Sequence, residues 1–99
     1  MTPRKKAPSN GLFAARDPRA EARVLEREAA SYPEERDWTL GEAAHQWRLA
    51  GEGDHAIELL QGMLADPEAD SDLVRSQLVE TYFALDRPDA AYEQIAELP

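Results

Sequence analysis

The chain resembles itself at a spacing of 34 to 35 residues, and this internal repeat constrains the fold more than any other feature of the sequence. A shift of 35 superposes Trp47 on Tyr82, Leu49 on Ala84, Ala56 on Ala91, Leu60 on Ile95 and Met63 on Leu98. A shift of 34 superposes Ala22 on Ala56, Leu25 on Leu59, Ala29 on Met63, Pro33 on Pro67 and Glu34 on Glu68. The sequence therefore predicts a half repeat at residues 17–34 and two full repeats at residues 37–68 and 71–99.

Apolar residues recur at helical spacing in five segments, whereas no part of residues 17–99 alternates with the period of a strand. Asp17 and Pro18 are typical of a helix start, because Asp accepts backbone N–H bonds and Pro fits the first helical position. Asp54 is expected to cap the third helix after the Gly51 and Gly53 turn. The expected helices cover residues 17–32, 37–50, 55–65, 72–85 and 89–98.

A helix, a turn and a second helix within 34 to 35 residues resemble the tetratricopeptide repeat family. The resemblance is carried by the late aromatics Trp47 and Tyr82, the small Ala56 and Ala91, the bulky Leu60 and Ile95, and the closing Pro67. It implies an all-α fold of antiparallel helix-turn-helix repeats, stacked as a short right-handed α-solenoid. Three positions depart from the family pattern, namely Ala44, Val79 and Glu26. A generic helical bundle is the alternative fold.

Charge is unevenly distributed along the chain. Residues 1–16 hold Arg4, Lys5, Lys6 and Arg16 and no acid, so subtracting +4 from the total of −9 leaves −13 for residues 17–99. Such an acidic body repels phosphate backbones, which predicts no nucleic-acid partner for the folded part. Residues 1–16 are expected to form a disordered basic tail, which either solubilises the protein, contacts nucleic acid or an acidic surface, or folds back onto the acidic body.

The chain contains no cysteine, which excludes disulfides and thiolate metal sites. The longest apolar run near its start, residues 12–15, is shorter than a signal peptide requires, and no stretch is long enough for a membrane span. We therefore expect a cytoplasmic protein with no membrane partner.

No set of residues carries a pattern of catalysis or metal binding. Glu42 and His45 form a single Glu-x-x-His step, whereas di-iron bundles use two such steps. The acidic run that starts at Asp66 lacks the glycine and the twelfth-position Glu of a calcium loop, because Gln77 occupies that position. The sequence predicts a protein that is not an enzyme and needs no cofactor.

The first helices of successive tetratricopeptide units line a concave groove, and the resemblance places a partner-binding surface there. The groove residues that it implies are Trp38, Glu42, His45, Arg48, Leu49, Leu73, Gln77, Glu80 and Phe83. Family members that clamp a chaperone carboxylate use Lys and Asn at positions where this chain has Gly41, His45, Ser76 and Glu80, which argues against such a clamp. Glu42 and Glu80 favour a neutral or basic peptide, with Trp38 and Phe83 as anchors; Trp38 is alternatively a core residue.

The last predicted helix ends at Leu98 without a polar capping helix, so apolar side chains around Val79, Phe83 and Tyr92 are expected to remain uncovered. Two functions follow. The chain is a non-catalytic module that binds a peptide or helix in its groove. Alternatively, it is a self-associating structural unit, or a fragment of a longer scaffold, joined through its C-terminal helices.

Overall fold

The structure is a computed structural model that describes residues 17–99. The predicted basic tail, residues 1–16, lies outside the described residues.

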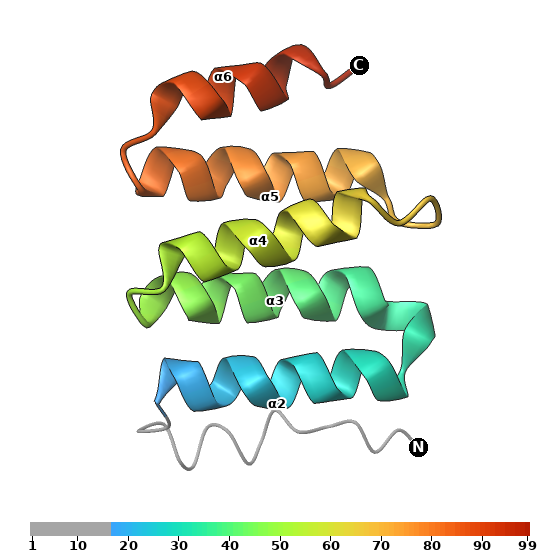
Figure 1. The fold of residues 1–99 in the computed structure, drawn as a ribbon. Helices are drawn as coiled ribbons and strands as arrows, with labels where there is room; N and C mark the ends of the chain where they lie inside the picture. The colour runs from blue at the N-terminus through green and yellow to red at the C-terminus, as the bar shows by residue number, and fades with distance from the viewer. Residues whose placement is uncertain (1–16) are drawn as a thin grey trace.

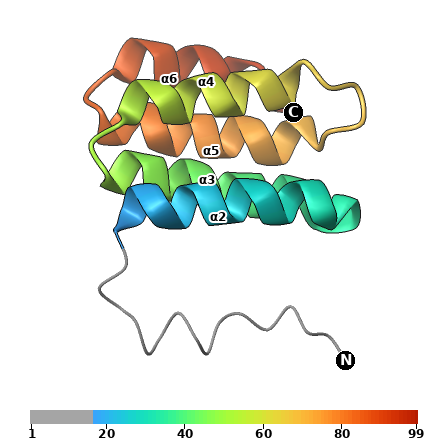
Figure 2. The ribbon, with the colours of Figure 1, turned by 60° about the horizontal axis from the view of Figure 1, so that its bottom comes forward.

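Residues 17–99 form an all-α fold without strands, in which the chain reverses direction at each connection (Figures 1 and 2). The elements are α2 (Pro18–Ser31), the short 3₁₀ helix η1 (Pro33–Glu35), α3 (Arg36–Leu49), α4 (Gly53–Leu64), α5 (Ser71–Ala84) and α6 (Pro88–Ala96). Every predicted helix is present, with ends within two residues of the expected ones.

The turns that follow α3 and α5 have the same backbone structure, 35 residues apart. Gly51 has a φ of +83°, and its counterpart Asp86 has a φ of +60°. The next residue, Glu52 or Arg87, donates its backbone N–H to the carbonyl of Trp47 or Tyr82, at 2.9 and 2.8 Å respectively. Both turns are therefore Schellman motifs, in which a left-handed residue closes the helix and satisfies its last carbonyls.

Aspartate side chains cap two of the helices. Asp17 accepts from the N–H of Arg19 at 3.2 Å, and Asp70 accepts from the N–H of Leu73 at the same distance. The predicted cap at Asp54 is wrong, because the Schellman turn leads directly into helical backbone and α4 already begins at Gly53. Asp54 instead lies in the first turn of α4, where its negative charge interacts favourably with the positive end of the helix dipole.

The helices pack in chain order, each against the next, as expected for a stack of helix pairs (Figure 1). Among the described elements, α3 also approaches α5, whereas α2 does not approach α4 and α4 does not approach α6. The stack is therefore tighter on the side of α3 and α5 than on the side of α2, α4 and α6.

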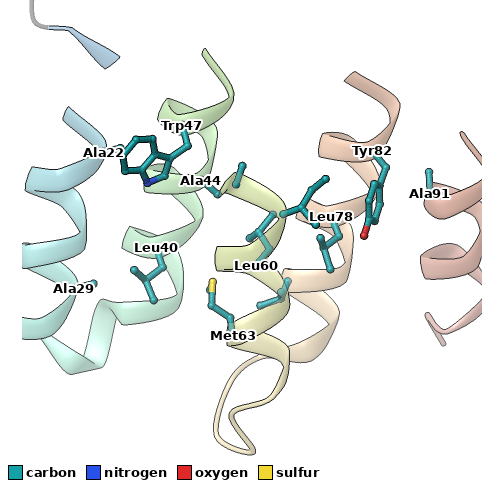
Figure 3. Close-up of a cluster of buried hydrophobic side chains, with 13 residues drawn as sticks. Ala22, Ala29, Leu40, Ala44, Trp47, Leu60, Met63, Leu78, Tyr82 and Ala91 are labelled. Atoms are coloured by element: carbon teal, nitrogen blue, oxygen red, sulfur yellow. The ribbon is translucent and has the colours of Figure 1, made fainter. Parts of the chain in front are cut away.

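The core repeats along the stack in the way that the internal repeat predicts (Figure 3). Ala22, Ala56 and Ala91 are fully buried at intervals of 34 and 35 residues. A larger side chain at these fully buried positions would push the packed helices apart. The aromatic positions Trp47 and Tyr82 are buried as well.

Trp47 also explains why Glu26 occupies a position where the repeat has a bulky apolar residue. The buried indole N–H of Trp47 donates to Oε2 of Glu26 at 2.6 Å. His55 stacks on the indole ring with centroids 4.0 Å apart, and the guanidinium of Arg23 lies 5.6 Å from the ring centroid. Glu26 thus satisfies a donor that would otherwise be buried without a partner.

Two ion pairs connect the starts of the helices that lie on the open side of the stack. Arg19 of α2 contacts Glu52 at 2.6 Å, and Arg87, which caps α6, contacts Asp54 of α4 at 2.9 Å. The hydrogen bond and charge of Glu52 raise the pKa of Arg19. Both pairs are exposed and contribute little stability, but they link α2, α4 and α6 across gaps that the backbones do not bridge.

Candidate functional site

A pocket of about 300 Å³ lies between α3 and α5, on the tighter side of the stack. Six of the nine predicted groove residues line it, namely Trp38, Glu42, His45 and Arg48 from α3 and Gln77 and Glu80 from α5. Its remaining lining residues are Gly41, Ala44, Leu60 and Thr81. The sequence-based prediction therefore names side chains that the fold brings together.

Gly41 leaves room for the side chain of Gln77 in this pocket. A Cβ atom at Gly41 would collide with the side-chain amide of Gln77, which lies against the bare backbone of α3. The side chain of Gln77 is consequently held in the pocket, with its Oε1 atom buried and without a hydrogen-bond partner. An unpartnered buried carbonyl is costly in water-free surroundings, so this amide can accept a hydrogen bond if its side chain turns toward a ligand.

The other polar groups of the pocket differ in whether they form hydrogen bonds or ion pairs. Arg48 has only donors, so its Nη2 donates to Nδ1 of His45 across 2.9 Å, while its Nε is buried without a partner. Glu42 and Glu80 form no ion pair with any residue of the described chain. The pocket therefore presents two unpaired carboxylates beside one guanidinium and is net acidic.

A second and larger pocket, of about 640 Å³, adjoins the first at the end of the stack where α2 meets α3 and α4 meets α5. It is lined by six carboxylates, one arginine, Pro33, Trp38 and Leu73. The acidic residues are Glu34, Glu35, Asp37, Asp66, Glu68 and Asp70, and the arginine is Arg36. Leu73, predicted as a groove residue, thus lies in this acidic pocket rather than between α3 and α5.

The walls of the acidic pocket are connected by contacts between residues about one repeat apart. Arg36 contacts Asp66 at 3.0 Å, and the backbone N–H of Asp70 donates to Oδ2 of Asp37 at 2.8 Å. Oδ1 of Asp66 accepts the N–H of Glu68 at 2.9 Å. The acidic run from Asp66 forms the turn between α4 and α5. No group of three or more His, Asp or Glu side chains within residues 17–99 is arranged to hold a metal.

Trp38 borders both pockets. Its side chain is 61% exposed, which excludes the alternative that Trp38 is a core residue. Large exposed aromatics of this kind are enriched at protein interfaces, because the ring covers a large apolar area and loses little conformational entropy on binding.

Two predicted groove residues lie outside both pockets. Leu49 is exposed at the end of α3. Phe83 is exposed near the end of α5 and packs edge-on against Tyr92 of α6, with ring centroids 5.6 Å apart and an interplanar angle of 87°. The structure therefore separates Phe83 from Trp38, the other predicted anchor.

Sequence reasoning missed the acidic wall around Trp38. The available signal was the repeat itself, because the shift of 34 that superposes Pro33 on Pro67 also aligns Glu34 with Glu68. Equivalent turns of a helical stack lie at the same edge, so their charges accumulate there.

Comparison with known proteins adds no family assignment. No family model, no curated protein and no solved structure matches the chain. None of the helices in the described part of the chain has the length and apolar composition needed to cross a bilayer.

Proposed function

We propose that this chain is a non-catalytic interaction module of the tetratricopeptide kind, which binds a peptide or helix along the surface of α3 and α5. The observation that carries the proposal is the position of Trp38, 61% exposed at the junction of two adjoining pockets. Two pockets that share an exposed aromatic anchor suit an extended or helical segment better than a small molecule.

The ligand of this groove is expected to be basic. Glu42 and Glu80 carry unpaired charge in the smaller pocket, and six carboxylates face a single arginine in the larger one. A Lys or Arg side chain near Trp38 would meet both the carboxylates and the face of the indole ring, where cation–π attraction adds to the ion pair. Complementary charge would also accelerate association at low ionic strength.

The experiment is selection of 12-residue peptides from a random display library by the immobilised protein, followed by affinity measurements on the selected peptides. We expect enrichment of peptides that combine an apolar residue with Lys or Arg. Trp38→Ala should weaken them at least tenfold, as truncation of a central aromatic commonly does. Leu49→Ala is the matched control, because Leu49 is an exposed apolar residue of the same helix that lines neither pocket.

Equal affinity of the selected peptides for wild type and Trp38→Ala, with the helical circular dichroism spectrum unchanged, would disprove the proposal. Equal loss in Trp38→Ala and Leu49→Ala would also contradict it, since the effect would then not belong to the pockets.

Self-association through the C-terminal helices is the second candidate function. It is favoured by one observation, the exposure of Phe83 and Tyr92 beside each other on α5 and α6. It requires an apparent mass that falls on dilution, which sedimentation across a wide concentration range measures.

A further inference from the structure

The middle of α3 contains a glycine that its backbone conformation does not require. Gly41 lies inside a regular helix, and among the described glycines only Gly51 has a positive φ. Glycine destabilises the interior of a helix relative to alanine, because it loses more conformational freedom on folding. Gly41 is also buried. Its structural effect is to leave a space where a side chain would lie, which we call the notch.

The side-chain amide of Gln77, from α5, fills the notch. A Cβ atom at Gly41 would collide with Nε2 of Gln77 and lie 2.9 Å from its Oε1. The three atoms nearest to that Cβ all belong to the Gln77 amide, and none belongs to the backbone of another helix. Gln77 is only partly buried and lines the pocket between α3 and α5, so its flexible end can turn out of the notch toward solvent.

The amide of Gln77 is poorly matched to this position. Its Oε1 atom is buried and accepts no hydrogen bond. The hydroxyl of Thr81, which lines the same pocket, donates to the backbone carbonyl of Gln77 at 2.8 Å instead. The buried residues Ala44 and Leu60 give the pocket an apolar floor. Because a buried carbonyl without a donor is unfavourable, an apolar group suits the notch better than the amide does.

We propose that Gln77 is a displaceable plug, and that the notch receives a branched aliphatic side chain, valine or leucine, of a peptide bound in the groove. An isopropyl group has the same number of non-hydrogen atoms as the amide that it replaces, and it buries no polar atom. The displaced amide then reaches solvent, where water satisfies its carbonyl. This inference rests on the proposed function and adds a sequence requirement to it.

The position of the notch relative to Trp38 determines the spacing within the peptide. Trp38 and Gly41 are three residues apart on α3, so they share one face of the helix and are separated by about one turn, roughly 5 Å. The proposed function places a Lys or Arg side chain near Trp38. Residues two apart in an extended peptide, or three to four apart in a helical one, span a similar distance. The aliphatic residue is therefore expected within about four residues of the basic one.

The test selects 12-residue peptides from a random display library on wild type and measures their affinities by fluorescence anisotropy. Wild type should enrich valine or leucine near Lys or Arg, and alanine at that peptide position should weaken binding at least fivefold. In Gly41→Ala the added methyl group occupies the notch, so the same two peptides should differ less than twofold. Gly62→Ala is the matched control and should keep the fivefold preference, because Gly62 lies on α4 outside both pockets and a Cβ there meets no atom within 4 Å.

Gln77→Ala tests the plug itself. It empties the notch without filling it, so the fivefold preference should remain. The aliphatic peptide should also bind at least twofold more tightly than to wild type, because no fraction of the free protein is then in the plugged state. The side-chain NH₂ signals of Gln77, assigned by their absence from the NMR spectrum of Gln77→Ala, should move on addition of peptide to wild type toward their positions in peptide-free Gly41→Ala. Gly41→Ala should melt no lower than wild type, because only the flexible end of Gln77 obstructs it.

Four results would overturn the inference. An equal preference for the aliphatic residue in wild type and Gly41→Ala, with Trp38→Ala still weakening the peptide, would do so and leave the proposed function standing. A Gly41→Ala protein that melts well below wild type would show that Gln77 is fixed in the notch. Weaker binding to Gln77→Ala would show that the amide contacts the peptide rather than giving way to it. A selection that yields no peptide dependent on Trp38 would overturn both this inference and the proposed function.

Discussion

The repeat pattern and the structure predict opposite changes in stability when Glu26 is replaced with leucine. The equivalent position of the next repeat is the fully buried Leu60, so the pattern alone predicts that leucine fits and stabilises the fold. In the structure, however, Glu26 is the acceptor for the buried indole N–H of Trp47, across 2.6 Å. We therefore expect Glu26→Leu to destabilise the protein.

The magnitude follows from two opposing contributions. Leaving the N–H of Trp47 buried without an acceptor costs about 1–3 kcal/mol. Glu26 is only partly buried, so leucine at this position gains under about 1 kcal/mol of additional apolar burial. The net loss in unfolding free energy is about 1–2 kcal/mol, or roughly 4–16 °C in Tm for a domain of this size.

Thermal and urea unfolding followed by far-ultraviolet circular dichroism measure this loss. Glu26→Gln is the matched control, because it keeps a carbonyl acceptor and removes only the charge; we expect it to lose less than about 1 kcal/mol. A Glu26→Leu protein as stable as wild type would refute the reasoning, since the hydrogen bond of Trp47 would then contribute nothing beyond what apolar packing supplies.

Two further pairs of substitutions test the fold. Leu60→Ala should cost about 2–5 kcal/mol because Leu60 is fully buried, whereas Ile95→Ala at the equivalent, 41% exposed position should cost about 1 kcal/mol, because solvent fills the space that it leaves. Urea unfolding measures both, and equal losses would contradict the difference in exposure between Leu60 and Ile95. Gly51→Ala should lose about 1–2 kcal/mol because alanine is strained at a φ of +83°, while Gly62→Ala should gain about 0.5–1 kcal/mol because it meets no atom within 4 Å. If thermal melts showed that both substitutions change Tm in the same direction, this account of the turn would be disproved.

The sequence alone determined the number of helices in residues 17–99, their approximate ends and their order of packing. It could do so because these properties depend on local signals. Helical spacing of apolar residues defines each helix, and Pro, Gly and Asp mark the boundaries. The internal repeat added the long-range information, since equivalent positions such as Ala22, Ala56 and Ala91 must be small wherever two helices meet.

The candidate groove could be predicted in part for the same reason. Residues on one face of α3 are neighbours because of helix geometry, and the repeat supplies the matching face of α5. The resemblance to tetratricopeptide repeats implied Glu42, His45 and Gln77 as residues of one groove, and the structure places them around one pocket. What they bind is still a proposal.

Only the tertiary structure decided the features that depend on contacts between different repeats. The sequence gives no reason for Glu26 to face Trp47, because their contact depends on the angle at which α2 crosses α3. The acidic wall around Trp38 likewise arises because two turns, at Pro33–Glu35 and at residues 65–70, lie at one edge of the stack. Phe83, predicted as an anchor of the groove, packs edge-on against Tyr92 of α6 and lines neither pocket. Periodicity specifies which face of a helix is apolar, but only packing specifies which neighbour that face meets.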